Sequence, residues 1–126
     1  MKTVRLGTTT RPWGSFYSLE KQDGYQVKQL RVKPESRTSL QYHDNRDEIW
    51  IVVKGHGLAW HVGIDGKSIV QETIGIGESI KVQCGFPHRI ENTSQESDLV
   101  IIEVQLGDPI EEEDIVRIAD DYGRVG

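Results

Sequence analysis

The sequence predicts a single all-β domain, and three observations support this fold class. The chain has 126 residues, which suits one domain with one hydrophobic core. Its 13 glycines separate short runs in which β-branched residues are frequent, a composition that favours strands joined by tight turns. These runs recur at a short, regular spacing that is typical of a β-sandwich or a closed β-barrel.

Strands are expected along most of the chain, beginning with residues 16–20 and with 25–33, where Pro34 ends the strand. Residues 48–53 are apolar on both faces, which predicts a central strand. The Asp65-Gly66 pair predicts a hairpin turn. The other expected strands are residues 39–43, 58–62, 67–71, 79–82 with a lead-in at 74–77, 88–91 and 99–106. We expect one domain over residues 1–126, with a barrel core at about 25–106.

The C-terminal tail differs in composition from the rest of the chain. Asp108-Pro109 can cap and start a helix, and the acidic residues 111–114 would then occupy its first turn. The sequence therefore predicts a short C-terminal helical segment, with the acidic run as its solvated start.

The composition excludes several classes of partner. The net charge is −5 and the pI about 5.3, which argues against binding to nucleic acid or to an anionic membrane. The apolar runs are of strand length, far too short to span a bilayer. Cys84 is the single cysteine, so no internal disulfide can form, and residues 1–5 lack the apolar segment of a signal peptide. We expect a cytoplasmic protein.

Four side chains form a candidate metal site. Gln41 and His43 are two residues apart on one expected strand, so they point to the same face. Glu48 and His88 each follow a turn at the start of a strand, and strand ends can converge when a sheet closes. Two imidazoles, a carboxylate and an amide oxygen suit a divalent transition metal with open coordination positions. The spacing alone equally allows surface histidines that only form hydrogen bonds.

At these residues the sequence resembles the cupin superfamily. The first cupin motif is G-x5-H-x-H-x3-4-E-x6-G. The chain fits its spacing with Gln41 in place of the first histidine, followed by His43, Glu48 and Gly55.

The second cupin motif, G-x5-P-x-G-x2-H-x3-N, is also present in the correct order. The matching residues are Gly77, Gly85, His88 and Asn92, with Gln83 in place of the proline. Two gapped motifs at the right separation make a specific match. The resemblance implies a jelly-roll barrel that holds a metal ion.

A closer resemblance covers nearly the whole chain. It is similar to the type II mannose-6-phosphate isomerase domain, which is commonly fused behind a mannose-1-phosphate guanylyltransferase. The matching stretches are residues 11–14, 26–28, 39–41, 46–53, 88–92, 101–105, 113–117 and 122–124. Phosphomannose isomerases of the other type also hold zinc with a glutamine, so Gln41 fits the resemblance. The family usually has a histidine run where Asp44 and Asn45 follow His43, and often a histidine at Ile49.

The resemblance implies an enzyme of polysaccharide biosynthesis that interconverts mannose 6-phosphate and fructose 6-phosphate. One divalent metal ion would touch O1 and O2 of the sugar and stabilise the ene-diolate. Zinc is the first expectation, and manganese, iron, cobalt and nickel are compatible with the same ligands. With no guanylyltransferase domain in these 126 residues, we expect that activity to be absent.

The sugar phosphate needs cationic anchors, and the candidates are Arg11, Lys28, Arg46 and Arg124. Any of these arginines can instead be a salt-bridge residue. Lys28 has the inward parity of its strand, so it either faces a buried anion or ligand or extends its amine to the barrel rim.

The proton must be carried by a nearby group, and Lys28, Arg89 and Glu103 are the catalytic candidates. Arg89 follows His88 and points the opposite way on a straight strand. Glu103 and Gln105 either support the ligands or form an ordinary hydrogen-bonded pair at a strand end.

Two other functions stay open on the same barrel. One is a non-enzymatic sugar- or metal-binding module, and the other is a metal-dependent dioxygenase. The apolar outer face of residues 48–53 also predicts a homodimer in which that face is covered.

Overall fold

The computed structural model describes residues 7–124, and within this range it is built of strands without any helix. The predicted all-β class is confirmed. The chain start, on which the signal-peptide argument rests, lies outside the described residues. The strands are β1 (Thr9–Arg11), β2 (Gly14–Gln22), β3 (Tyr25–Val32), β4 (Ser36–Arg37), β5 (Leu40–Tyr42), β6 (Arg46–Lys54), β7 (His56–Val62), β8 (Ile69–Gly75), β9 (Ser79–Val82), β10 (Arg89–Asn92), β11 (Leu99–Gly107) and β12 (Val116–Ala119).

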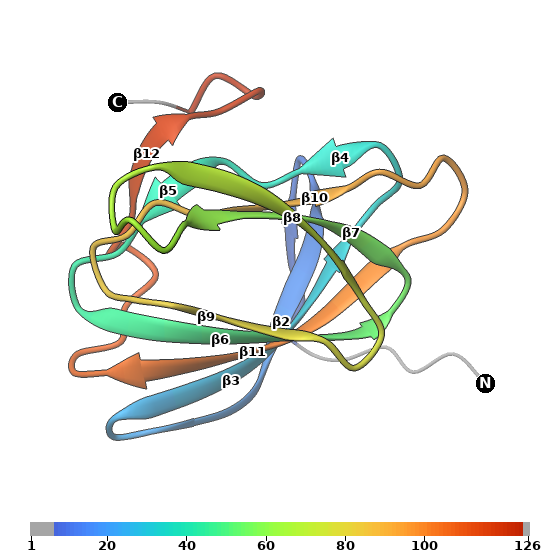
Figure 1. The fold of residues 1–126 in the computed structure, drawn as a ribbon. Coiled ribbons are helices and arrows are strands. Elements are labelled where there is room, and N and C mark those ends of the chain that lie inside the picture. Colours follow the sequence, from blue (N-terminus) through green and yellow to red (C-terminus); the bar gives the residue numbers. More distant parts are fainter. Residues whose placement is uncertain (1–6, 125–126) are drawn as a thin grey trace.

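The strands form two main sheets and a small one. The six-stranded sheet has the order β1-β2-β3-β11-β6-β9, and the four-stranded sheet has the order β4-β10-β7-β8. Figure 1 shows these two sheets as the layers of a barrel, with the β5–β12 pair at one end. Most neighbours in the sheets are distant in sequence, which is typical of a jelly roll.

The inward faces of β3, β6 and β11 are apolar at one end of the barrel and polar at the other. Ile101 lies between Leu30 and Val52 in the ladder, and all three are buried. Two residues further along β11, Glu103 lies between Lys28 and Trp50. The next inward row is Gln26, Gln105 and Glu48. Because side chains alternate across a strand, these paired rows all face the interior. The polar rows define the end of the barrel where chemistry can occur.

Several strands differ from their expected bounds. The expected strand at residues 67–71 and the start of the expected lead-in at 74–77 belong to one strand, β8, which pairs with β7 over its whole length. The short strands β1, β4 and β12 were not expected from the sequence. They are held by partners elsewhere in the chain, a cause that local sequence patterns do not contain.

The prediction of a C-terminal helical segment is wrong. Residues 108–115 form an irregular segment with a bend at 108–109 and a turn at 112–113, and β12 follows as a strand paired with β5. Asp114 explains the difference, since its carboxylate accepts hydrogen bonds from the backbone N–H groups of Asp44 and Asn45, at 2.8 and 2.9 Å. Its carbonyl bonds to His43, and Glu112 pairs with Lys28. These tertiary partners replace the helical hydrogen bonds that the local sequence favours.

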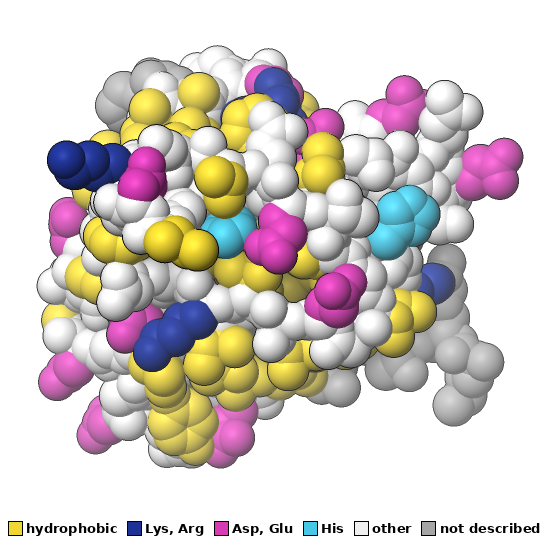
Figure 2. Space-filling model, in the orientation of Figure 1, with side chains coloured by type: hydrophobic (Ala, Val, Ile, Leu, Met, Phe, Trp, Pro, Cys, Tyr) yellow, Lys and Arg dark blue, Asp and Glu magenta, His cyan; other side chains and the backbone are white. Residues whose placement is uncertain are grey.

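The outer face of the six-stranded sheet carries apolar side chains. β6 is central in this sheet, as predicted, between β11 and β9. Its outward residues Ile51 and Val53 are 39% and 45% exposed within one chain. Figure 2 shows hydrophobic side chains gathered on the side of the molecule where this sheet lies. Among the described residues, no helix is long and apolar enough to cross a membrane.

Candidate metal centre

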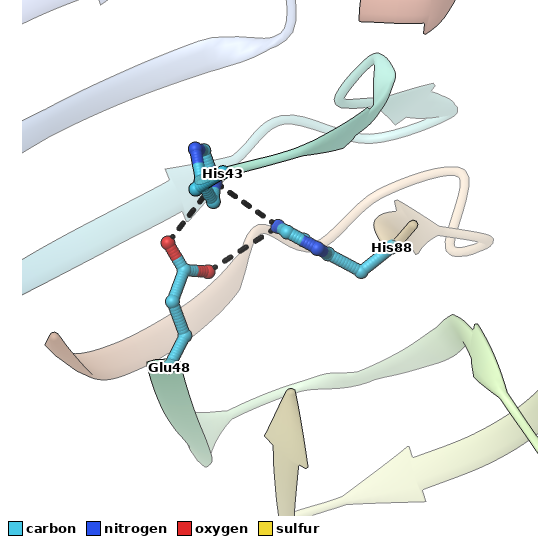
Figure 3. A group of neighbouring side chains, drawn as sticks. All are labelled: His43, Glu48 and His88. Carbon is cyan, nitrogen blue, oxygen red and sulfur yellow. Dashed lines mark hydrogen bonds and ion pairs between the residues drawn. The ribbon is translucent and has the colours of Figure 1, made fainter. Parts of the chain in front are cut away.

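His43, Glu48 and His88 meet inside the polar end of the barrel. Each is buried, and one potential ligand atom from each lies within 4.8 Å of the other two. The His43 Nε2 is 3.2 Å from Glu48 Oε2, and the His88 Nε2 is 3.4 Å from Glu48 Oε1. The two Nε2 atoms are 3.2 Å apart, so the three groups form the closed triangle seen in Figure 3. We call these three residues the triad.

Local structure explains how the triad assembles. Glu48 is the third residue of β6, where the strand parity turns it inward. His88 is bridged to Gln41 by two backbone hydrogen bonds, of 2.8 and 3.0 Å, which bring the second motif beside the first. His43 leaves β5 two residues after Gln41. The turn that follows it is fixed by Asp114, a positioning residue that the sequence analysis missed.

Both histidines turn their Nε2 atoms toward the centre for the same reason. The Nδ1 of His43 lies 2.6 Å from the Asp114 carbonyl oxygen, and the Nδ1 of His88 lies 2.9 Å from the Phe86 carbonyl oxygen. A carbonyl can only accept a hydrogen bond, so each Nδ1 carries the proton and donates. In each neutral ring the Nε2 lone pair is then free to bind a metal ion.

The spacing of the triad fits a divalent cation. Donors at about 2.0–2.2 Å from a tetrahedral zinc ion lie roughly 3.3–3.6 Å apart. The observed separations of 3.2 and 3.4 Å are close to that range. Two imidazole nitrogens and one carboxylate form the mixed donor set of catalytic sites that keep an open position. The geometry thus supports the metal ligands predicted at His43, Glu48 and His88.

Gln41 faces the same cavity as the triad. Its Oε1 accepts a hydrogen bond from the Ser39 hydroxyl at 3.1 Å, so the amide oxygen is oriented by a neighbour. Among the described residues, no hydrogen bond joins the Gln41 side chain to the triad. Its place as a fourth ligand stays a prediction.

A buried carboxyl pair adjoins the triad. The indole N–H of Trp50 lies 3.1 Å from Glu48 Oε1 and 3.2 Å from Glu103 Oε1, so it donates between the two carboxyls. Burial works against the charged form of Glu48, yet His88 and His43 hold the pKa of Glu48 well below its usual range. Burial and the neighbouring Glu48 carboxylate raise the pKa of Glu103 well above its usual range. The pair thus favours the charged form of Glu48 and the protonated form of Glu103.

Glu103 and Gln105 prove to have both of the roles considered for them. The Gln105 amide donates to Glu103 Oε2 at 3.1 Å and accepts from the Gln26 amide at 2.8 Å. The pair is hydrogen-bonded at the strand end, and the Trp50 indole N–H also joins Glu103 to the triad carboxylate of Glu48.

Arg46 lies against two of the three triad members. Its Nε donates to Glu48 Oε2 at 2.9 Å, and its Nη2 lies 3.2 Å from the His43 Nε2. Because a ring nitrogen has one lone pair, a metal ion bound at His43 Nε2 would release that Arg46 N–H toward the cavity.

His43 brings the triad to the wall of a cavity of about 590 Å³, a volume that includes its open mouth. Five cationic side chains line it against two carboxyls, although the whole chain carries a net charge of −5. The cations are Arg11, Lys28, Arg46, Arg117 and Arg124, and the carboxyls are Glu103 and Glu112. A cationic cavity in an acidic protein favours an anionic ligand.

Lys28 is buried, with 4% of its surface exposed. Its amine forms an ion pair with Glu112 and lies 4.1 Å from the centre of the Phe16 ring. Lys28 thus lies beside an anion, but the Glu112 side chain is about half exposed and is not the buried anion that was expected.

The remaining predicted arginines divide between the cavity and the opposite face. Arg11 and Arg124 line the cavity mouth. Arg89 does not, because the residue after His88 has the opposite strand parity. The Arg89 guanidinium bonds to the Thr38 carbonyl at 2.9 Å and packs over the Trp60 ring at 5.1 Å. Arg117 is a cavity residue that the sequence analysis did not single out. In the sequence, the one feature that marks Arg117 is its position in residues 113–117, a stretch that matches the family.

The fold is that of solved cupin structures. The capsular polysaccharide assembling protein CapF from Staphylococcus aureus aligns with a TM-score of 0.76 and 23% identity, over 93% of this chain and 35% of that chain. A mutant of the Bacillus subtilis oxalate decarboxylase OxdC aligns with a TM-score of 0.73 and 16% identity, over 94% and 34% of the two chains. At such identities the likeness shows the fold, and it confirms the predicted cupin barrel.

Curated relatives are much closer in sequence. "Mannose-1-phosphate guanylyltransferase" of Escherichia coli (strain K12) is 44% identical over 115 residues, 91% of this chain and 23% of that protein. "Alginate biosynthesis protein AlgA" of Pseudomonas aeruginosa is 40% identical over 114 residues, 90% of this chain and 22% of that protein. The chain thus spans about a quarter of the length of these relatives. The family model described as "Mannose-6-phosphate isomerase C-terminal" matches residues 2–120, and the chain therefore belongs to this family.

Proposed function

We propose that the chain is a metal-dependent isomerase that interconverts mannose 6-phosphate and fructose 6-phosphate. The observation that carries the proposal is a buried His43–Glu48–His88 donor set open to a cationic cavity in a member of this family. The donor set suits a Lewis-acidic metal, and the cavity suits a phosphorylated substrate.

The proposed metal ligands are Gln41, His43, Glu48 and His88, with zinc as the first expectation. When bound, the metal ion supplies Lewis-acid stabilisation of the negative charge on the sugar oxygens. Arg46 adds a fixed positive charge beside the same oxygens, since its guanidinium already contacts two ligands and lines the cavity.

We assign the proton transfers of the isomerisation to the two carboxyls of the cavity. Glu112 is the proposed base, held in the cavity by its ion pair with Lys28, and it takes the proton from C2 and returns it to C1. Glu103, whose pKa is raised by burial and by the neighbouring Glu48 carboxylate, is the proposed acid toward the carbonyl oxygen O1. It recovers a proton from the O2 hydroxyl, so the net change is isomerisation alone. Arg89 lies outside the cavity and is assigned a structural role.

A coupled assay with mannose 6-phosphate tests the proposal on the purified chain after metal removal and reloading. We expect conversion in the loaded protein, none after chelation, and recovery when metal returns. The H88A variant should lose turnover, whereas H61A, altered in a surface histidine paired with Glu72, should keep it. Absence of turnover in both directions by the loaded protein contradicts the proposal. Tight sugar-phosphate binding without turnover would instead identify a binding module.

The assembly and location are further parts of the proposal. The exposed apolar face around Ile51 and Val53 supports a homodimer, which sedimentation can test. Cytoplasmic location stays a prediction from the sequence. The whole relatives' other activities are not assigned to this quarter of their length.

A further inference from the structure

We propose that Arg117 is the centre of a phosphate subsite, formed with Arg11 and Arg124 at the cavity mouth. The inference deepens the proposed function and rests on it for the identity of the sugar. The phosphate subsite itself can be tested without any turnover.

The first observation is an unsatisfied donor. The Arg117 Nε is buried, and within the part of the chain that the structure describes it has no hydrogen-bond partner. Buried N–H groups are nearly always paired, and a charged one left unpaired costs free energy. Arg117 lines the cavity, so an anion bound there can accept this N–H.

The second observation is an accumulation of positive charge. Arg11 comes from β1, Arg117 from β12 and Arg124 from the turn after β12, yet all three line one cavity. Burial, and then the charge of Arg124 and of Arg11, lower the pKa of Arg117. Asp120 neutralises part of this charge through two hydrogen bonds from the Arg124 side chain, at 2.7 and 3.0 Å. The remaining excess favours a phosphate dianion, whose oxygens match the guanidinium fork.

The third observation relates this subsite to the metal centre. Arg117 pairs with Gln41 across the β12–β5 ladder, and Gln41 pairs with His88 on its other side. Residues directly opposite one another in a ladder share a face. Arg117 and His88 are thus separated by two strand spacings, roughly 9–10 Å. This arrangement suits an extended sugar phosphate, with the reacting oxygens at the triad and the phosphate at the mouth.

The test uses inorganic phosphate as the probe and the Arg Nε–H signals of a ¹⁵N-labelled protein as the readout. The R117K variant identifies the Arg117 signal by its loss. We expect this signal to shift on phosphate addition in the wild-type protein. The R117Q variant should bind phosphate about 10- to 100-fold more weakly, the effect of losing a charged hydrogen bond. The R31Q variant should bind it normally, since Arg31 faces outward and pairs with Asp98.

R11Q provides a second variant at an exposed end of the subsite, in case R117Q does not fold. We expect R11Q to weaken phosphate binding as well. An Arg117 signal that stays unmoved by phosphate, or equal phosphate affinities in wild type, R117Q and R11Q, would overturn the subsite. Phosphate binding without isomerisation would leave the subsite in place and reject only the proposed function.

Discussion

The Nε2 atoms of His43 and His88 lie 3.2 Å apart, and each also lies within 3.4 Å of a Glu48 carboxylate oxygen. Each Nδ1 lies within hydrogen-bond distance of a backbone carbonyl oxygen, which turns both Nε2 atoms toward the centre of the triad. A cation bound at the centre would be coordinated by both rings and by the Glu48 carboxylate, and its binding free energy would add to the stability of the fold.

We therefore expect added zinc to stabilise the fold, by about 2.7 kcal/mol at a free concentration one hundred times the dissociation constant. H43A and H88A should lose this gain in thermal unfolding, because each removes a donor. H61A is the matched control and should keep it, since His61 bonds to Glu72 on the surface. Equal zinc stabilisation in all three variants would exclude the triad as the site.

Gln41 gives a separate test of the fourth ligand. The Q41H variant should retain the metal ion, because an imidazole at this position restores the first histidine of the cupin motif. Q41A should bind it more weakly, since one donor is lost. Elemental analysis after dialysis measures both, with Q29A on the outward face of β3 as control. Wild-type metal retention by Q41A would remove Gln41 from the ligand set.

Trp50 should stabilise the fold through its N–H group as well as its ring. W50F keeps most of the packing but leaves Glu48 and Glu103 without their shared donor. We expect a loss of about 1–3 kcal/mol in urea unfolding, the cost of unsatisfied buried groups. W60F removes a half-buried indole bond to Glu91 and should cost less. If W50F and W60F lose the same free energy of unfolding, the hydrogen bonds to the buried carboxyl pair do not add more stability than a half-buried one.

Asp120 makes one part of the stability dependent on pH. Its hydrogen bonds from Arg124 lower the pKa of Asp120 from 3.8 to about 2. A carboxyl whose pKa is depressed in the folded state stabilises the fold above its unfolded pKa, and the gain is lost as pH falls through the folded value. The difference in unfolding temperature between wild type and D120N should thus be constant near neutrality and shrink between about pH 4 and pH 2. A difference in unfolding temperature that stays constant from about pH 4 to pH 2 would contradict this role of Asp120.

Gly14 is required for the turn that brings Arg11 and Trp13 to the cavity. A Cβ at Gly14 would lie 1.9 Å from the Arg31 carbonyl oxygen. G14A should therefore destabilise the fold strongly, because backbone must move. At Gly24 the same substitution meets open space at a φ of +86°, so G24A should cost only about 1–2 kcal/mol from backbone strain. Denaturant unfolding measures the free energy of unfolding of both variants. Similar losses in G14A and G24A would contradict the argument from the steric clash at Gly14.

Alternation along the strands made much of the site predictable from sequence. Because side chains change face at every residue, Lys28 could be placed on the inward face of its strand. The same rule put Gln41 and His43 on one face. The motif spacing then identified Glu48 and His88 as partners, and the triad geometry supports those assignments.

Contacts between distant segments could not be predicted in this way. In the sequence, Asp114 looks like part of a solvated helix start. In the structure it fixes the turn after His43 and bonds to the His43 ring, although the two residues are 71 positions apart. Arg117 looks like one of many surface arginines, but its pairing with Gln41 carries it to the cavity. Such placements depend on which strands pair, and pairing is decided by the packing of the whole barrel.

The sequence by itself determined the cupin barrel, the inward parity of its strands and the metal-type donors, since these follow from local alternation and motif spacing. Only the tertiary structure decided the shared indole bond of Trp50, the strand in place of the C-terminal helix and the arginine group at the mouth. The physical reason is that each of these depends on hydrogen bonds and charges between residues that the chain brings together only when the sheets close.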